Sequence, residues 1–338
     1  MHEFQFGPLQ PFVDDMYITD INYNGDTLWL DDLRKGRYPI DDFDEAEFMK
    51  QFCFKIANYV NQPFNVTSPL LEAETESLRI SILHESIARG GHSISIRKTP
   101  ACMRMSETSV VKNKYATEEL IQFLKTAVNH HFNILICGLP GVGKTELIKL
   151  LSTAIPNHER VITIEDTMEL RYHQLHPQRD CVAMKVSEQF DYTQAIKASL
   201  RQRPDWILVS EVRSREVVHL LESMSTGTHL LSTLHCRSAD KIPYRIQQMY
   251  PGQEIDNHQL EQVIYDAIDL GICIHSEISM QGVYRYIHSV IAFYLEDGSP
   301  KQTLLYQKDQ AIDLEEVIPH EIKLRLQDKK PSKRGKKR

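Results

Sequence analysis

A glycine-rich loop between an expected apolar strand and a helix limits the possible folds of this 338-residue chain more than any other segment. The strand is expected over 132–137, and the loop after it reads Gly138-Leu139-Pro140-Gly141-Val142-Gly143-Lys144-Thr145. Glycines at this spacing let backbone N–H groups turn inward around phosphates, and the start of the following helix adds positive potential. We therefore expect these eight residues to bind nucleotide phosphates, with the Lys144 ammonium on the β- and γ-phosphates and the Thr145 hydroxyl on Mg²⁺.

Helices and strands alternate from Thr117 onward. Thr117 has the form of a helix N-cap, because Glu118 and Glu119 follow it in the first turn, where carboxylates suit the helix dipole. Nearly continuous apolar runs, typical of strands inside a parallel sheet, recur over 132–137, 161–164, 206–209 and 230–234. This alternation predicts an α/β domain with a parallel, helix-covered sheet.

The first hundred residues predict a smaller α+β domain. Alternating apolar residues indicate strands, and helical spacing indicates one helix over 43–59; the strands are expected over 17–23, 27–30, 78–82 and 92–97. A polar, weakly patterned stretch follows and fits a linker. We therefore divide the chain into an N-terminal domain, a linker, the α/β domain and a basic disordered tail, over 1–104, 105–116, 117–326 and 327–338.

Composition limits the classes of protein that this chain can be. It holds 46 acidic and 39 basic residues, and it has no apolar run of the roughly 18 residues that a membrane helix needs. Its six cysteines never form a CxxC pair, which favours reduced thiols in an intracellular protein. We expect a cytoplasmic protein.

The basic tail points to anionic partners. Seven of its residues from Lys329 to Arg338 are basic and none is acidic, so it is expected to remain unfolded. Such a run attracts anionic lipid or nucleic acid, and the alternative is a solvated, mobile tail without a partner.

Two carboxylates end the apolar strand over 161–164. Ligands of parallel sheets bind at the carboxyl ends of the strands, so Glu165 is placed to polarise the water that attacks a γ-phosphate. The alternative for Glu165 and Asp166 is a structural one, in which a carboxylate caps a helix or solvates the end of the strand.

Two further strand ends carry groups suited to phosphate chemistry. Glu211 follows the strand over 206–209 and is expected to hold the Mg²⁺ shell or to orient water, while Arg213 forms an ion pair nearby or reaches phosphate. His235 ends the strand over 230–234, where an imidazole can bind a γ-phosphate and report its loss. A zinc site of His229, His235 and Cys236 is disfavoured, because their spacing fits no common tetrahedral set.

These segments together resemble the secretion ATPase superfamily, which serves type II secretion, type IV pili and type IV secretion. The resemblance rests on four boxes in the family's order: Gly138–Thr145 (Walker A), Ile164–Leu170 (Asp box), Arg203–Arg213 (Walker B) and Ser232–His235 (His box). The segments Glu165–Leu170, Arg203-Pro204-Asp205, Thr19–Asn22 and Ser95–Lys98 look like the branch serving type IV secretion and Tad-type pili. The chain departs from the family at Ser210, where glycine is usual, and at Cys236-Arg237-Ser238, where Ala-Asn-Ser is usual.

The resemblance implies a RecA-like P-loop motor domain in a homo-hexameric ring that uses ATP and Mg²⁺. It implies that Arg79 and Arg97 supply cationic contacts to the phosphates, whereas a reading from the residues alone leaves them as exposed arginines at strand ends. It also implies inner-membrane platform proteins as partners, at the cytoplasmic face of the inner membrane. The machine implied is one of type IV secretion, conjugation or pilus assembly.

Two alternatives to a secretion motor remain open. A RecA-like motor that translocates nucleic acid would suit the basic tail, although the chain is acidic overall and shows no groove of alternating aromatic and basic residues. A non-catalytic, nucleotide-sensing assembly subunit would bind ATP without turnover.

Overall fold

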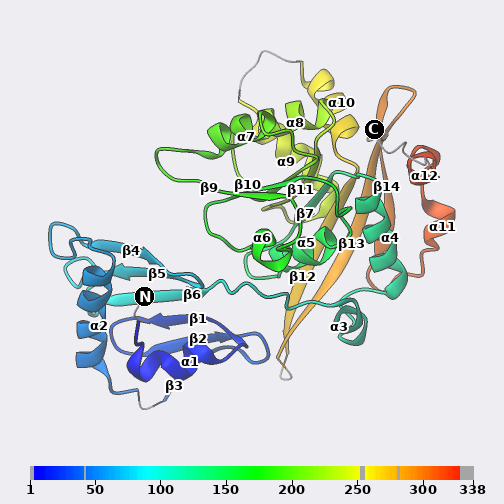
Figure 1. Cartoon of the computed structure of the whole chain (residues 1–338). Helices are drawn as coiled ribbons and strands as arrows, with labels where there is room; N and C mark the ends of the chain where they lie inside the picture. Colours follow the sequence, from blue (N-terminus) through cyan, green and yellow to red (C-terminus); the bar gives the residue numbers. More distant parts are fainter. Residues whose placement is uncertain (1–3, 42, 252–255, 280–281, 328–338) are drawn as a thin grey trace. The chain divides into compact units, whose positions relative to one another are not determined.

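The computed structural model describes residues 4–41, 43–251, 256–279 and 282–327 (Figure 1). The chain forms two compact units, of which the first comprises Met1–Ala101 with Glu277–Tyr284 and the second Cys102–Ser276 with Arg285–Arg338. The basic tail lies outside the described residues from position 328 onward. None of the described helices has the length and apolar character that crossing a membrane requires.

The first unit is built on a six-stranded antiparallel sheet in the order β3-β2-β1-β6-β5-β4. Its strands are β1 (Ile18–Tyr23), β2 (Leu28–Asp32), β3 (Gly36–Ile40), β4 (Leu70–Glu74), β5 (Leu78–Leu83) and β6 (Ser93–Lys98). Its helices are η1 (Gly7–Leu9), α1 (Gln10–Asp14) and α2 (Ala46–Tyr59). The sequence predicted β1, β2, β5, β6 and α2, but it missed β3 and β4.

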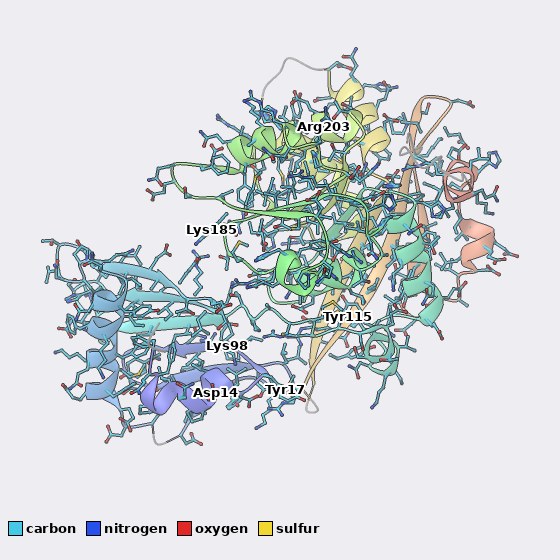
Figure 2. The ribbon with its side chains drawn as sticks, in the orientation of Figure 1. Asp14, Tyr17, Lys98, Tyr115, Lys185 and Arg203 are labelled. Carbon is cyan, nitrogen blue, oxygen red and sulfur yellow. The ribbon has the colours of Figure 1, made fainter. Side chains whose placement is uncertain are left out.

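Helix α2 covers the apolar face of this sheet. Its buried side chains recur at helical spacing and belong to one core with the inward-facing residues of the strands: Met49, Phe52, Cys53 and Ile56. Tyr59, the last residue of the helix, is half exposed. At the opposite end of the unit the Lys98 ammonium donates to the carbonyls of Asp15 (2.6 Å) and Phe12 (3.4 Å), which ties β6 to α1 (Figure 2).

The second unit contains an eight-stranded sheet in the order β14-β13-β12-β7-β11-β10-β8-β9. Neighbouring strands from β12 to β9 run parallel, whereas β13 and β14 pair antiparallel. The strands are β7 (Ile134–Cys137), β8 (Val161–Glu165), β9 (Cys181–Lys185), β10 (Trp206–Val212), β11 (His229–Leu234), β12 (Leu270–Ser279), β13 (Gly282–Glu296) and β14 (Ser299–Gln307).

Helices lie on both faces of this sheet. Successive residues of each central strand point in opposite directions, so each strand packs its side chains against both helical layers. Ile134 and Ile136 of β7 join a core with α4 and α5, whereas Leu135 and Cys137 join a second core with α7 to α10 (Figure 1). The helices of the unit are α3 (Glu107–Lys112), α4 (Glu118–Asn129), α5 (Lys144–Ser152), α6 (Tyr172–Leu175), α7 (Tyr192–Leu200), α8 (Val217–Ser225), η2 (Ala239–Lys241), α9 (Ile242–Met249), α10 (Asn257–Ala267), α11 (Leu314–Val317) and α12 (His320–Gln327).

The predicted fold class is confirmed: a parallel, helix-covered α/β sheet follows a smaller α+β unit. Two details differ from the sequence-based expectations. The presumed linker over 105–116 holds α3, whose capping box joins Ser106 and Ser109. Residues 277–284, assigned by sequence to the second domain, belong to the first compact unit.

The backbone at Gly282 explains this grouping. Its φ is +116°, and a Cβ added there would lie 1.6 Å from the Arg34 carbonyl oxygen. The backbone near the start of β13 therefore lies directly against the β2–β3 turn, at a distance that only glycine allows.

We expect Gly282→Ala to lower the free energy of unfolding by more than about 2 kcal/mol, because the methyl group overlaps backbone that cannot move aside. Gly298→Ala is the matched control, since Gly298 has a φ of +75° with nothing within 4 Å of an added Cβ. Urea unfolding of both variants is the measurement. Equal losses of stability in the two variants would contradict the close approach at Gly282.

Candidate functional site

The glycine-rich loop joins the end of β7 to the start of α5 (Figure 1). Gly138, Gly141 and Gly143 have φ values of +145°, +78° and +93°, which residues with a Cβ rarely adopt. A Cβ on Gly138 would also lie 2.5 Å from the Ile274 carbonyl oxygen. The loop therefore depends on glycine both for its turn and for its packing against β12.

Lys144 is bound inside the loop that precedes it. Its ammonium donates to the carbonyl oxygens of Gly138 (2.9 Å) and Leu139 (3.1 Å), and the residue is 8% exposed. Burial lowers the pKa of Lys144, and the nearby Glu211 carboxylate opposes that effect. A phosphate in the loop would offer oxygen atoms to the same ammonium.

The other loop residues differ in exposure. Leu139 lies at the surface with 68% of its area exposed, Pro140 is also exposed, and Val142 is buried in the core beside α5. Val142 therefore anchors the loop. Any contact of Leu139 with phosphate would go through its backbone N–H, whereas Pro140 has no N–H to donate.

Thr145 contacts a carboxylate from the segment after β8. Its hydroxyl donates to Glu169 Oε2 at 3.0 Å. The sequence analysis did not select Glu169 as a site residue, although it lies in the quoted Ile164–Leu170 box. The signal that could have found it is its position, since it is the second glutamate of a short segment that follows a central strand.

Glu165 does not face a solvent-accessible site. It ends β8 fully buried, and its Oε2 accepts backbone hydrogen bonds of 2.7 Å from Glu169 and from Leu170. In this structure Glu165 neither caps a helix nor solvates the strand end, and its expected role in polarising the attacking water stays a prediction. The carboxyl fixes the backbone that carries Glu169.

Burial raises the pKa of Glu165 from 4.5 to about 7, against the lowering effect of the two backbone hydrogen bonds. The folded state therefore favours the protonated carboxyl. The stability that Glu165 contributes is complete below pH 4.5 and is lost as the pH rises through about 7.

We expect the wild type and Glu165→Gln to differ in how their free energies of unfolding depend on pH. The amide cannot ionise, so the wild type should lose stability relative to the variant as the pH rises from 4.5 to about 7. Urea unfolding at a series of pH values measures this difference. Parallel pH profiles for the two proteins would contradict the raised pKa.

Glu211, Arg213, His235 and Asp166 form one ion-pair network across neighbouring strand ends. Glu211 Oε1 lies 3.0 Å from His235 Nε2, and Glu211 Oε2 lies 2.9 Å from an Arg213 nitrogen. Arg213 also donates to Asp166 Oδ2 at 2.9 Å. The structure thus brings Glu211 and His235 together, and Arg213 makes the ion pair that the sequence left as one of two options.

An open cavity of about 280 Å³ adjoins this network. Acidic, basic and apolar side chains line it: Glu211, Val212, Arg213, His235, Arg245 and Met249. Because β7, β11, β10 and β8 are parallel neighbours, their carboxyl ends lie at the same edge of the sheet. The loop and His235 follow these ends, and Glu211 and Glu165 lie in the last two residues of their strands. The arrangement suits binding of a phosphate and a hard cation, since oxygen groups and an ammonium converge there.

Arg79 and Arg97 lie in the first unit, opposite each other on β5 and β6. Each has an acidic neighbour, Glu72 at 3.6 Å from Arg79 and Asp20 at 2.9 Å from Arg97. Both guanidinium groups remain substantially exposed. The structure therefore brings the two arginines together on one face of the first sheet.

The comparisons with known proteins agree with this architecture. A family model described as "Type II/IV secretion system protein" matches residues 69–285. An uncharacterised protein of Bacillus anthracis is 27% identical over 291 residues, which cover 82% of this chain and 66% of that protein. The type IV secretion system protein VirB11 of Bartonella quintana is 30% identical over 182 residues, which cover 49% of this chain and 50% of that protein. The chain thus spans about half to two thirds of the length of these relatives.

Solved structures extend the likeness to the fold. The Yersinia pseudotuberculosis ATPase DotB superposes with a TM-score of 0.63 at 13% identity, covering 83% of this chain and 76% of that one. This likeness confirms the expected RecA-like motor fold. The family match covers more than half of the sequence and includes the glycine-rich loop, Glu169, Glu211 and His235, so the chain belongs to the type II/IV secretion system protein family.

Proposed function

We propose that this chain is a Mg²⁺-dependent ATPase whose turnover drives a type IV secretion, conjugation or pilus assembly machine. The observation that carries the proposal is the convergence of Lys144, Thr145, Glu169 and Glu211 at one edge of the sheet. Membership of the family and similarity to the type IV secretion system protein VirB11 and to the ATPase DotB support the same function.

The donor set fits nucleotide with Mg²⁺. The loop Gly138–Thr145 offers inward-turned backbone and one ammonium, which suit the phosphates of ATP. The Thr145 hydroxyl and the Glu211 carboxylate are oxygen groups of the kind that Mg²⁺ prefers, directly or through water. Bound Mg²⁺ would neutralise charge on the β- and γ-phosphates.

The side chains around the phosphates are proposed to have different roles in hydrolysis. Glu169 orients the attacking water and accepts its proton, while Glu165 acts as a positioning residue that holds the Glu169 backbone. His235 binds the γ-phosphate and transmits its loss through Glu211 to Arg213. Arg79 and Arg97 are proposed to supply the cations that stabilise the transition state.

The chain is also proposed to act as part of an assembly. We propose a homo-hexameric ring that docks on platform proteins at the cytoplasmic face of the inner membrane. A ring supports coupling, because closure of each subunit around ATP can do work on its neighbours.

Steady-state phosphate release with ATP and Mg²⁺, measured across protein concentration, tests the function. We expect turnover that rises steeply with concentration, vanishes with EDTA and is restored by Mg²⁺. Nucleotide binding without turnover at any concentration would contradict an autonomous ATPase and favour the nucleotide-sensing subunit. Turnover that requires added DNA would favour the nucleic-acid motor.

A further inference from the structure

The open cavity beside the Glu211 network has a cation in its lining that the proposed hydrolysis does not use. Arg245 lines the cavity from α9, whereas Arg213 and His235 line it from the segments after β10 and β11. Arg245 and Met249 lie four residues apart on α9, so they share one face of that helix. We call this cavity of about 280 Å³, with the lining given above, the Arg245 cavity.

The charges around the Arg245 cavity are unequally paired. Arg213 is held by two carboxylates, Glu211 at 2.9 Å and Asp166 at 2.9 Å. Within the part of the chain that the structure describes, the half-buried Arg245 has no carboxylate partner, and its guanidinium contacts Gln248 Oε1 at 3.4 Å. The charge of Arg245 can therefore serve an anion that enters the cavity.

Glu211 gives the same cavity a hydrogen-bond acceptor. Its Oε1 lies 3.0 Å from His235 Nε2, and its Oε2 lies 2.9 Å from Arg213. A carboxylate has about four lone-pair positions, so these two contacts leave acceptor capacity. A ligand that suits both Arg245 and Glu211 is an anion that also carries a proton to donate.

We propose that the Arg245 cavity binds inorganic phosphate, with Arg245 on the phosphate oxygens and Glu211 accepting a hydrogen bond from the phosphate hydroxyl. Inorganic phosphate keeps at least one proton near neutral pH, and the guanidinium fork matches a pair of its oxygens. Sulfate has the same shape but no proton at that pH, so the Glu211 carboxylate repels it. The apolar side chains of Val212 and Met249 exclude part of the water, which strengthens the hydrogen bonds to the anion.

The identity of this phosphate as a reaction product rests on the proposed ATPase function. In that proposal His235 binds the γ-phosphate, and His235 also lines the Arg245 cavity. The attacking water gives one proton to Glu169 and leaves its other hydrogen on the new phosphate, so the product carries the hydroxyl that Glu211 accepts. The cavity thus holds the cleaved phosphate next to the place where it forms.

Calorimetric titration of the full-length protein tests the site without turnover. The protein is saturated with ADP and Mg²⁺, which fill the glycine-rich loop, and is titrated with inorganic phosphate and with sulfate at neutral pH. We expect one phosphate per chain and sulfate binding at least about tenfold weaker, because sulfate leaves the carboxylate without a donor. No phosphate binding, or equal affinities for the two anions, would overturn the proposal.

Arg245→Gln and Arg201→Gln are the variants to compare in this titration. Arg201 is an exposed arginine at the C-cap of α7, and it does not line the cavity. Arg245→Gln should bind phosphate at least about tenfold more weakly, because it removes charge-assisted hydrogen bonds, whereas Arg201→Gln should bind like the wild type. Equal phosphate affinities in the two variants would contradict a site at Arg245.

Glu211→Gln tests the acceptor through the choice between the two anions. The amide can donate to sulfate as well as accept from phosphate, so the preference for phosphate should fall to nearly equal affinities. A structural role of Glu211 alone would weaken the binding of both anions alike. An unchanged ratio of affinities would therefore overturn the assignment of Glu211 as the acceptor.

Lys144→Ala separates this cavity from the glycine-rich loop. If the protein binds no ADP, the proposed function fails, and the phosphate titrations are then made without nucleotide. Phosphate binding that Arg245→Gln weakens and Lys144→Ala retains would support the Arg245 cavity. The reverse pattern would assign the ion to the glycine-rich loop and overturn the proposal.

Inhibition by added phosphate is the second readout. ADP formation is measured with increasing inorganic phosphate, and each rate is divided by the rate of the same variant without phosphate. Half-inhibition of Arg245→Gln should need at least about tenfold more phosphate than half-inhibition of the wild type or of Arg201→Gln. Equal inhibition of all three proteins would overturn the role of the cavity in holding the product.

Discussion

Replacing Lys144 by alanine is expected to reduce kcat/KM for ATP by about 10³-fold. The ammonium is a buried charge that makes two hydrogen bonds with loop carbonyls, and in the proposed complex it contacts two phosphates. Removing one member of a buried, hydrogen-bonded charge pair costs about 4 kcal/mol, and each 1.4 kcal/mol corresponds to about tenfold. Steady-state phosphate release, together with titration of a fluorescent ATP analogue, measures the loss.

Lys197→Ala is the matched control for Lys144→Ala. Lys197 lies exposed in the last turn of α7, so its removal should leave kcat/KM unchanged. The stability of Lys144→Ala should fall little, because burial already penalises the ammonium and lowers its pKa. Wild-type turnover in Lys144→Ala would exclude the glycine-rich loop as the site of hydrolysis.

The sequence predicted the parts of the second unit that carry strong local patterns. The apolar runs identified β7, β8, β10 and β11, because strands at the centre of a parallel sheet are buried on both faces. The strands β12 to β14 were not predicted. Strand β12 pairs with β7 over a long separation that a local pattern does not show, and the hairpin of β13 and β14 was missed although its strands meet across a two-residue turn. A long separation also hid the role of Gly282, whose constraint comes from Arg34 about 250 residues earlier.

The site was predictable as a set of strand ends but not as a set of side-chain directions. Glu165 and Glu169 both belong to one short acidic segment, and composition alone cannot decide which carboxylate turns inward. The backbone decides it, because Glu165 is the last residue of β8 and accepts the N–H groups of the following turn. Glu169, four residues later, is then free to reach Thr145.

Glu169→Gln is therefore expected to lower kcat by about 10²- to 10³-fold, since general bases contribute effects of this size. KM for ATP and the midpoint of thermal unfolding should change little, because the amide oxygen can still accept the Thr145 hydrogen bond. Glu165→Gln should retain turnover within a few fold, because the amide resembles the protonated carboxyl that burial favours and its oxygen still accepts the two backbone N–H groups.

The pair of variants separates the two possible assignments of the water-orienting carboxylate. A large loss in Glu169→Gln with near-normal turnover in Glu165→Gln would support Glu169 as the general base and Glu165 as its positioning residue. The opposite pattern would return the catalytic role to Glu165, and it would require the buried carboxyl to leave its two backbone hydrogen bonds during turnover. Glu165→Leu completes the test, because it removes both acceptors: if Glu165 only holds the turn, this variant should lose stability and kcat together.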